Sequence, residues 1–76
     1  MVVKVKTRVL GVTDKMSKKG NIYSLVGFMD GANYLNCILD EYIDKATITP
    51  FAECELTLDI KLGKYTSVKV IGYEEV

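Results

Sequence analysis

The chain has 76 residues, which allows one small domain and excludes a two-domain enzyme. Hydrophobic residues make up 49% of it and charged residues 26%, a balance typical of a folded domain rather than a disordered chain. Ten basic residues offset ten acidic ones, so the net charge does not by itself indicate a nucleic-acid partner. The chain has no run of about 20 apolar residues and no N-terminal apolar stretch of the signal-peptide kind. We therefore expect a cytoplasmic protein that does not enter a membrane.

The inventory of side chains argues against an enzyme. There is no histidine, which removes the Ser-His and Cys-His nucleophile pairs and the most common metal ligand. Cys37 and Cys54 cannot complete a four-ligand zinc site on their own, and in a reducing compartment we expect them to be free thiols. We predict no catalytic residue, no metal site and no cofactor.

The first half of the sequence predicts three strands. Residues 2–12 alternate β-branched with basic residues, which is the two-residue period of a strand. The polar residues 13–21 end in Gly-Asn and indicate a loop. Residues 22–29 and 34–39 are the next two strands, joined by an Asp-Gly turn. Gly27 suggests a bulge or a sharp bend.

The second half begins with an irregular segment and ends in a hairpin. Residues 40–52 break the alternation, and we expect a short helical turn or loop there, capped by Asp40, with Tyr42 turned inward. Residues 53–62 alternate almost without interruption, with their leucines facing inward. A Gly-Lys turn follows, and residues 65–73 form the last strand.

Five short strands cannot build a sandwich with two covered faces, but they can close into a small barrel, which also hides the strand edges. The irregular segment lies where an OB-fold carries its helix or loop. We therefore predict that residues 1–76 form a single all-β domain, a five-stranded OB-like barrel with a short helical turn or loop between strands 3 and 4. A small SH3-like barrel is the competing architecture.

The even charge balance hides an asymmetry along the chain. Residues 1–20 carry six basic side chains and one carboxylate, whereas residues 21–60 carry seven carboxylates and one lysine. A basic first strand and loop can attract phosphates locally while another side of the molecule stays acidic. The alternative is that these charges only keep the surface soluble.

Four of the seven aromatic residues lie close to predicted turns. Tyr23 lies just past the basic loop, and Tyr65 follows Lys64 at the last turn. Phe28 and Tyr34 flank the Asp-Gly turn. Rings beside lysines fit a groove in which bases stack and phosphates pair, and each stacked base contributes about 1–3 kcal/mol whatever its identity. The alternative for each ring is the core or its rim, and packing is our main assignment for Tyr42, Phe51 and Tyr73.

Three short stretches share their order and spacing with a known family. Residues 18–25 read KKGNIYSL, residues 28–34 read FMDGANY, and residues 60–68 read IKLGKYTSV. In this order they resemble the DNA-binding wing, the central turn and the last hairpin of the small single-stranded DNA-binding proteins of filamentous phages. The resemblance covers roughly residues 12–76.

The resemblance implies an OB-like barrel, a two-fold homodimer and cooperative coating of single-stranded DNA. It implies that Tyr23, Phe28 and Tyr65 are stacking rings and that Lys18 contacts a phosphate. The chain departs from the family at positions where the family carries basic residues: Thr13, Asn21, Gly72 and Glu74. Fewer cations predict weaker and less salt-sensitive binding.

We predict a non-enzymatic protein that binds single-stranded DNA without sequence specificity and coats or protects it in phage or mobile-element replication or recombination. The candidate nucleic-acid-binding residues are Arg8, Lys15, Lys18, Lys19, Tyr23, Phe28, Tyr34, Lys64 and Tyr65. RNA fits the same platform, and the thin core favours a homodimer. The alternative is a small β-barrel protein-interaction module without nucleic-acid binding, which the acidic central segment favours.

Overall fold

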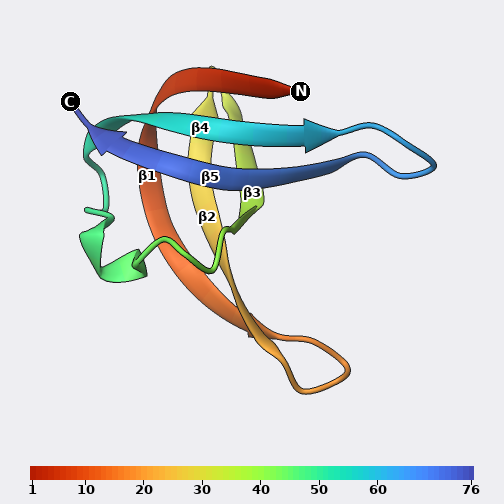
Figure 1. Cartoon of the computed structure of the whole chain (residues 1–76). Helices are drawn as coiled ribbons and strands as arrows, with labels where there is room; N and C mark the ends of the chain where they lie inside the picture. Colours follow the sequence, from red (N-terminus) through yellow and green to blue (C-terminus); the bar gives the residue numbers. More distant parts are fainter.

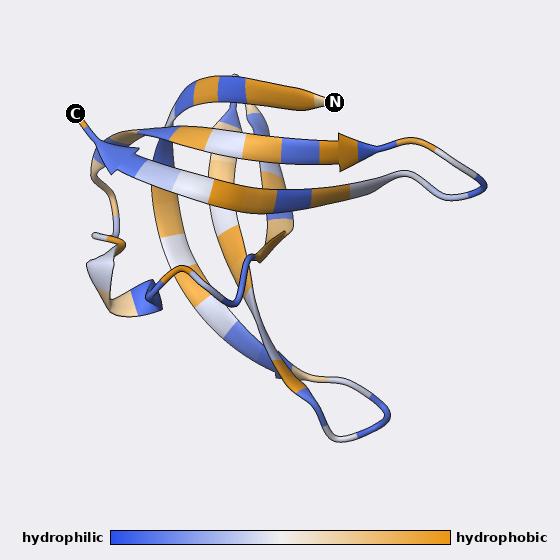
Figure 2. Ribbon diagram, viewed as in Figure 1, coloured by the Kyte–Doolittle hydropathy of each residue, from blue (hydrophilic) through white to orange (hydrophobic).

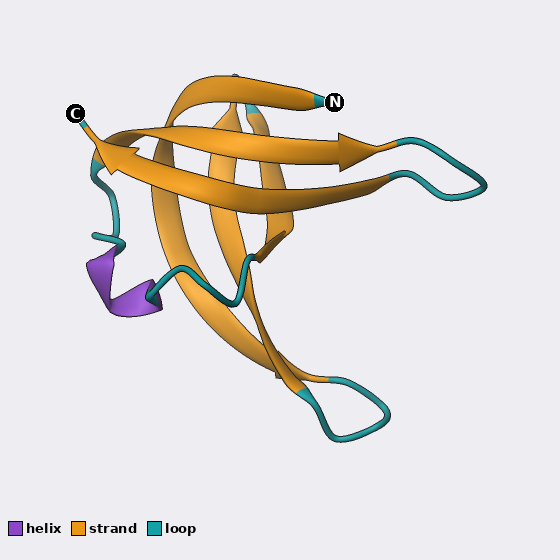
Figure 3. Ribbon diagram, in the orientation of Figure 1, coloured by secondary structure: helices purple, strands orange, loops and turns teal.

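Five strands close into a barrel, with one helical turn between the third and the fourth strand (Figures 1 and 3). The computed structural model describes all of residues 1–76. The strands are β1 (Val2–Met16), β2 (Ile22–Asp30), β3 (Asn33–Leu39), β4 (Glu53–Lys61) and β5 (Ser67–Glu75), and the turn η1 is a 3-10 helix (Lys45–Thr47).

The strand order is β1-β2-β3-β5-β4, and β4 closes the ring by pairing with β1. Every neighbouring pair is antiparallel except β3 and β5, which run parallel. The long strand β1 pairs with β4 as far as Arg8 and with β2 from Val9 onward. This arrangement confirms the predicted five-stranded OB-like barrel with its short helical turn between strands 3 and 4.

The core consists of the inward-facing residues of all five strands together with one residue of the β3–β4 connection. The buried hydrophobic residues are Val9, Val26, Phe28, Cys37, Leu39, Ile48, Cys54, Leu56, Leu58 and Val70. Most of them follow the alternation that predicted the strands, as in β4, where every second residue from Cys54 to Leu58 is buried. Both cysteines are free, and burial raises the pKa of each thiol.

The first hairpin is longer than predicted. Strand β1 continues to Met16, and the segment that was expected to be a loop pairs with β2 as far as Met16 opposite Ile22. These residues lack an apolar alternation because the end of the hairpin projects from the barrel and both its faces meet solvent (Figures 1 and 2). The register irregularity lies in β1, between Val9 and Gly11, rather than at Gly27.

The connection between β3 and β4 differs from the prediction in detail. The side chain of Asp44, not that of Asp40, caps η1 by accepting a hydrogen bond from the Ala46 amide at 2.9 Å. The backbone carbonyl of Asp40 instead closes the preceding turn by accepting from the Ile43 amide at 3.0 Å. Tyr42 is 89% exposed, so the prediction that it turns inward was wrong. Phe51 is also exposed, whereas Tyr73 packs against the core as expected. The chain's one helical segment, η1, is far too short to cross a membrane.

Candidate nucleic-acid interface

The β1–β2 and β4–β5 hairpins both extend from the barrel toward the right of the view in Figure 1, and β3 separates β2 from β5 in the strand order. The β1–β2 loop is closed tightly, because the Ser17 amide donates to the Asn21 carbonyl at 2.8 Å and the Gly20 amide donates to the Ser17 carbonyl at 2.9 Å. Gly20 adopts a φ of 86°, which a residue with a side chain rarely does. This compact loop leaves Lys18 and Lys19 exposed at its tip, where Figure 2 shows hydrophilic residues.

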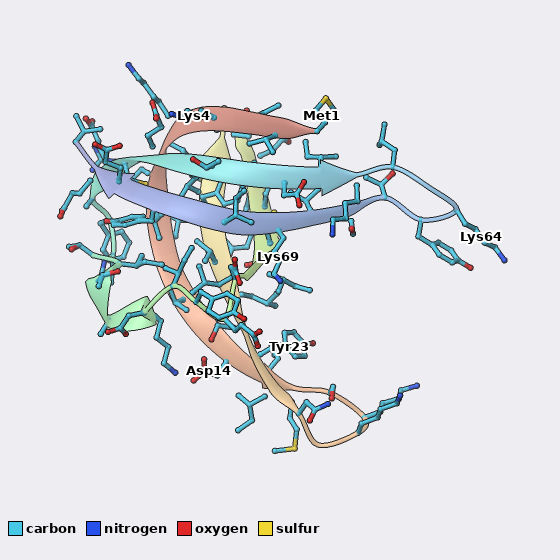
Figure 4. The ribbon with its side chains drawn as sticks, in the orientation of Figure 1. Met1, Lys4, Asp14, Tyr23, Lys64 and Lys69 are labelled. Atoms are coloured by element: carbon cyan, nitrogen blue, oxygen red, sulfur yellow. The ribbon has the colours of Figure 1, made fainter.

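The second hairpin carries a lysine and an aromatic ring at its tip. The β4–β5 loop spans residues 62–66, so β5 begins two residues later than predicted. Tyr65 is 80% exposed, and the Lys64 ammonium lies 5.7 Å from the centre of its ring (Figure 4). A cation over the ring face fixes the relative position of a phosphate-binding group and a stacking surface.

The outer faces of β2 and β3 present one further ring each, Tyr23 on β2 and Tyr34 on β3. Tyr23 is 38% exposed (Figure 4 labels it) and lies opposite Lys15 in the β1–β2 register, so these two side chains share the outer face. Leu25 lies opposite Ile38 on the same face, since paired residues in neighbouring strands point to the same side. This face, from Tyr23 along β2 and β3 to Tyr34, is called the β2–β3 face below.

Tyr34 lies across Gly27 at the far end of the β2–β3 face. A Cβ atom at position 27 would collide with the Tyr34 hydroxyl and would lie 3.0 Å from the Cζ atom of that ring. The Tyr34 hydroxyl donates a hydrogen bond to the Asn36 side-chain oxygen at 2.9 Å. Gly27 is therefore not a bend in β2 but the space that seats this ring against the sheet.

Seven of the nine predicted residues lie on the two hairpins and the β2–β3 face. Those on the first hairpin are Lys15, Lys18, Lys19 and Tyr23, those on the second are Lys64 and Tyr65, and Tyr34 lies at the start of β3, at the far end of the β2–β3 face. All seven are exposed.

Phe28 and Arg8 do not belong to this group. Phe28 lies two positions after the buried Val26, so its side chain points into the barrel as well, and it is only 1% exposed. Phe28 is therefore a core residue and not a stacking ring. The Arg8 guanidinium donates to Glu53 at 3.0 Å and to the Phe51 carbonyl at 3.2 Å. Arg8 therefore lies at the start of β4, where the Val76 amide also donates a hydrogen bond to the Glu53 carbonyl. It does not lie beside the β1–β2 loop or the β4–β5 loop.

Sequence reasoning missed an apolar cleft between β3 and β5. The cleft has a volume of about 610 Å³ and is lined by Leu25, Phe28, Leu35, Asn36, Cys37, Ile38, Leu58, Ile60, Thr66, Ser67 and Val68. One signal was available, because residues 34–39 carry apolar side chains on both faces of the strand. A strand that is apolar on both faces indicates that something covers its outer face.

A carboxylate holds the base of the first hairpin to η1. Asp14 accepts a hydrogen bond from Ser24 at 2.7 Å and pairs with the Lys45 ammonium. The bond from Lys45 and, next, the bond from Ser24 lower the pKa of Asp14 below its usual value of 3.8. These contacts neutralise a negative charge that would otherwise face the same hairpin as Lys15.

No group of three or more histidine, cysteine, aspartate or glutamate side chains is placed to hold a metal ion. Comparison of the chain with protein-family models, with curated proteins and with solved structures gives no significant match. The function is therefore argued from the geometry of this chain.

Proposed function

We propose that the protein binds single-stranded DNA without sequence specificity and coats or protects it during phage or mobile-element replication or recombination. The observation that carries the proposal is the placement of two lysine-bearing and tyrosine-bearing hairpins on either side of the exposed β2–β3 face. In OB-folds, the face formed by strands 2 and 3 and the loops L12 and L45 bind oligonucleotides.

The pattern of ion pairs supports the same face. The five ion pairs of the structure use the N-terminus, Lys4, Arg8, Lys45 and Lys69 as cations. Four lysines at or near the tips of the two hairpins, Lys15, Lys18, Lys19 and Lys64, take part in none of them. Four unpaired ammonium groups beside exposed rings are the arrangement that a phosphate backbone with unstacked bases requires.

Some carboxylates lie away from the candidate interface and others border it, since Asp40, Glu41 and Asp44 line a pocket together with Tyr23. Glu53 and Glu55 on β4 pair with Arg8 and Lys4 of β1, on the side of the barrel where those two strands meet. Phosphates that approach the tips of the hairpins meet Lys18, Lys19 and Lys64, whereas the base of the first hairpin adjoins acidic side chains.

We further propose a homodimer and a cytoplasmic location. The small core of ten buried hydrophobic residues and the exposed Leu62 beside Tyr65 support a second copy as a partner. The two free cysteines support a reducing compartment. RNA is a second ligand of the same platform, because a ring stacks on either kind of base and nothing in the proposal reads the 2′-hydroxyl.

Titration of the tyrosine fluorescence with oligo-dT, at low and moderate salt, tests the proposal. We expect quenching by the single strand, weaker affinity at higher salt and no response to duplex of the same length. The chain has no tryptophan, so its tyrosines supply the signal. Tyr65→Phe should lower the quenched amplitude and leave the affinity unchanged, since phenylalanine stacks but emits little.

The matched control is Tyr42→Phe, which replaces an exposed tyrosine fluorophore outside the interface and should leave the quenched amplitude unchanged. An oligo-rU titration measures the preference between DNA and RNA. The absence of any response to oligo-dT at low salt would overturn the proposal and favour the protein-interaction module.

A further inference from the structure

The seam between β3 and β5 is the least complete of the barrel. The two strands pair at only two positions, Ile38 opposite Lys69 and Leu39 opposite Val70. The parallel alignment would bring residues 35–37 beside residues 66–68, but these segments are not paired. The cleft of about 610 Å³ lies between them and reaches from the surface into the core.

The cleft has an apolar floor and a polar rim. Three of its lining residues, Phe28, Cys37 and Leu58, are buried members of the core. Asn36, Thr66 and Ser67, all exposed, form its mouth. None of the eleven lining residues is charged. These walls suit a flat, neutral group that is largely apolar and carries polar atoms along one edge.

The amide of Asn36 is oriented at this rim by a neighbouring ring. Its side-chain oxygen accepts the hydrogen bond from the Tyr34 hydroxyl at 2.9 Å. The side-chain nitrogen makes no hydrogen bond in the structure, so both of its hydrogens remain available. The rim therefore offers a donor held in place at the edge of an apolar cleft.

Two lysines of the β4–β5 hairpin adjoin this uncharged cleft. Lys64 and Tyr65 come directly before the rim residue Thr66, and Lys69 follows the lining residue Val68. The Lys69 ammonium lies 3.8 Å from Asp40, so Lys64 is the one of the two that takes part in no ion pair (Figure 4 shows Lys69 and Lys64 on the same hairpin). A neutral base attached to a negatively charged phosphate backbone matches an uncharged cleft with a cation beside it.

We propose that the β3–β5 cleft seats one nucleobase of the bound strand and that Asn36 donates a hydrogen bond to a carbonyl oxygen of its ring. This inference rests on the proposed single-stranded DNA binding and adds a position where a base is inserted rather than stacked. Tyr34 acts there as a positioning residue, because it fixes the Asn36 amide. Thymine, whose ring carries two carbonyl groups, is the probe of choice.

Chemical modification of Cys37 tests the seat directly, because this thiol lines the cleft. We expect saturating oligo-dT to slow the modification of Cys37 by maleimide at least tenfold, with the modified residue located by mass spectrometry. Cys54 is the internal control: it is buried on another side of the barrel, beside Arg8 and Val76, and its rate reports any general stabilisation by the ligand. An oligomer of the same length without bases should give no protection of Cys37.

The donor is tested with a pair of charge-matched variants. Asn36→Asp keeps the acceptor for Tyr34 and removes both donor hydrogens, while Asn33→Asp adds the same charge on the same strand outside the cleft. We expect Asn36→Asp to lower the affinity for oligo-dT about tenfold more than Asn33→Asp does.

The outcomes separate the two proposals. If oligo-dT binds but slows the modification of Cys37 no more than that of Cys54, the base seat is overturned and the proposed function stands. Equal losses in the two asparagine variants overturn the role of Asn36. An oligo-dT that does not bind at all overturns both the seat and the proposed function.

Discussion

The hydroxyl of Tyr34 occupies the space in which a side chain at Gly27 would begin. The two residues lie on adjacent strands, and the missing side chain on β2 is what allows the ring on β3 to lie against the sheet. The same hydroxyl bonds Asn36, so one glycine determines the placement of a ring and, through it, of an amide.

Gly27→Ala should therefore destabilise the protein by about 1 kcal/mol, the low end of the cost of overpacking, because the new methyl group displaces the hydroxyl end of the half-exposed Tyr34 ring. The measurement is the free energy of unfolding in urea. Gly11→Ala is the matched control: Gly11 lies opposite Gly27 in β1, and a Cβ there would meet no atom within 4 Å. If the collision is the cause, the cost of Gly27→Ala should largely disappear in a Tyr34→Ala background.

Combining Tyr23→Ala with Tyr65→Ala should weaken binding of oligo-dT by about 2–6 kcal/mol, the sum for two stacked bases. The fold should persist, since both rings are exposed. Circular dichroism reports the fold and fluorescence anisotropy of a labelled oligonucleotide reports the affinity. Tyr42→Ala should leave the affinity unchanged, and a double variant that binds as tightly as the natural chain would remove these rings from the interface.

Phe28→Ala should act on stability rather than on a stacking contact. This buried ring contributes to the core, and its removal should cost about 3–5 kcal/mol of unfolding free energy. Tyr65→Ala is the comparison, because the unfolding free energy of that variant should stay within about 0.5 kcal/mol of the value for the natural chain. A Phe28→Ala protein as stable as the natural chain would contradict the core assignment.

The salt dependence of binding should report the unpaired lysines. Each phosphate neutralised on a single strand adds about 0.7 to the slope of log affinity against log salt, so four lysines predict a slope of about −3. Lys18→Gln and Lys19→Gln should each lower the magnitude of this slope by about 0.7. Lys4→Gln, at a lysine 3.8 Å from Glu55, should leave the slope unchanged.

Acid should weaken the tie between the first hairpin and η1. The pKa of Asp14 is lowered in the folded protein by Lys45 and Ser24, so its carboxylate stabilises the fold at pH values above 3.8. That contribution is lost as the pH falls below 3.8 and through the lowered pKa of the folded state. Urea unfolding from pH 7 to pH 3 should show Asp14→Asn less stable than the natural chain at neutral pH and the difference shrinking in acid. A difference that does not change with pH would assign the effect to hydrogen bonding alone.

Alternation along the strands predicted much of the fold, because the inward residues of a small barrel repeat every second position. The same rule could have excluded Phe28 as a partner of Tyr23, since their sequence positions differ by an odd number within one unbroken strand and the two side chains point to opposite faces. The position of Arg8 depends on which strand pairs with the first half of β1, a non-local choice that charge patterning does not determine. The β3–β5 cleft depends on where two parallel strands separate, and no local pattern encodes that.

The two-pair contact between β3 and β5 also affects how the barrel fluctuates. The other four seams carry at least six residue pairs each, so the backbone amides of β3 and β5 along their shared edge should exchange with solvent sooner than those of the remaining ladders. Opening there leaves β3 paired to β2 and β5 paired to β4. The barrel can therefore widen at one seam while the two hairpins keep their attachment, which gives a ligand an entrance that does not require the rest of the domain to unfold.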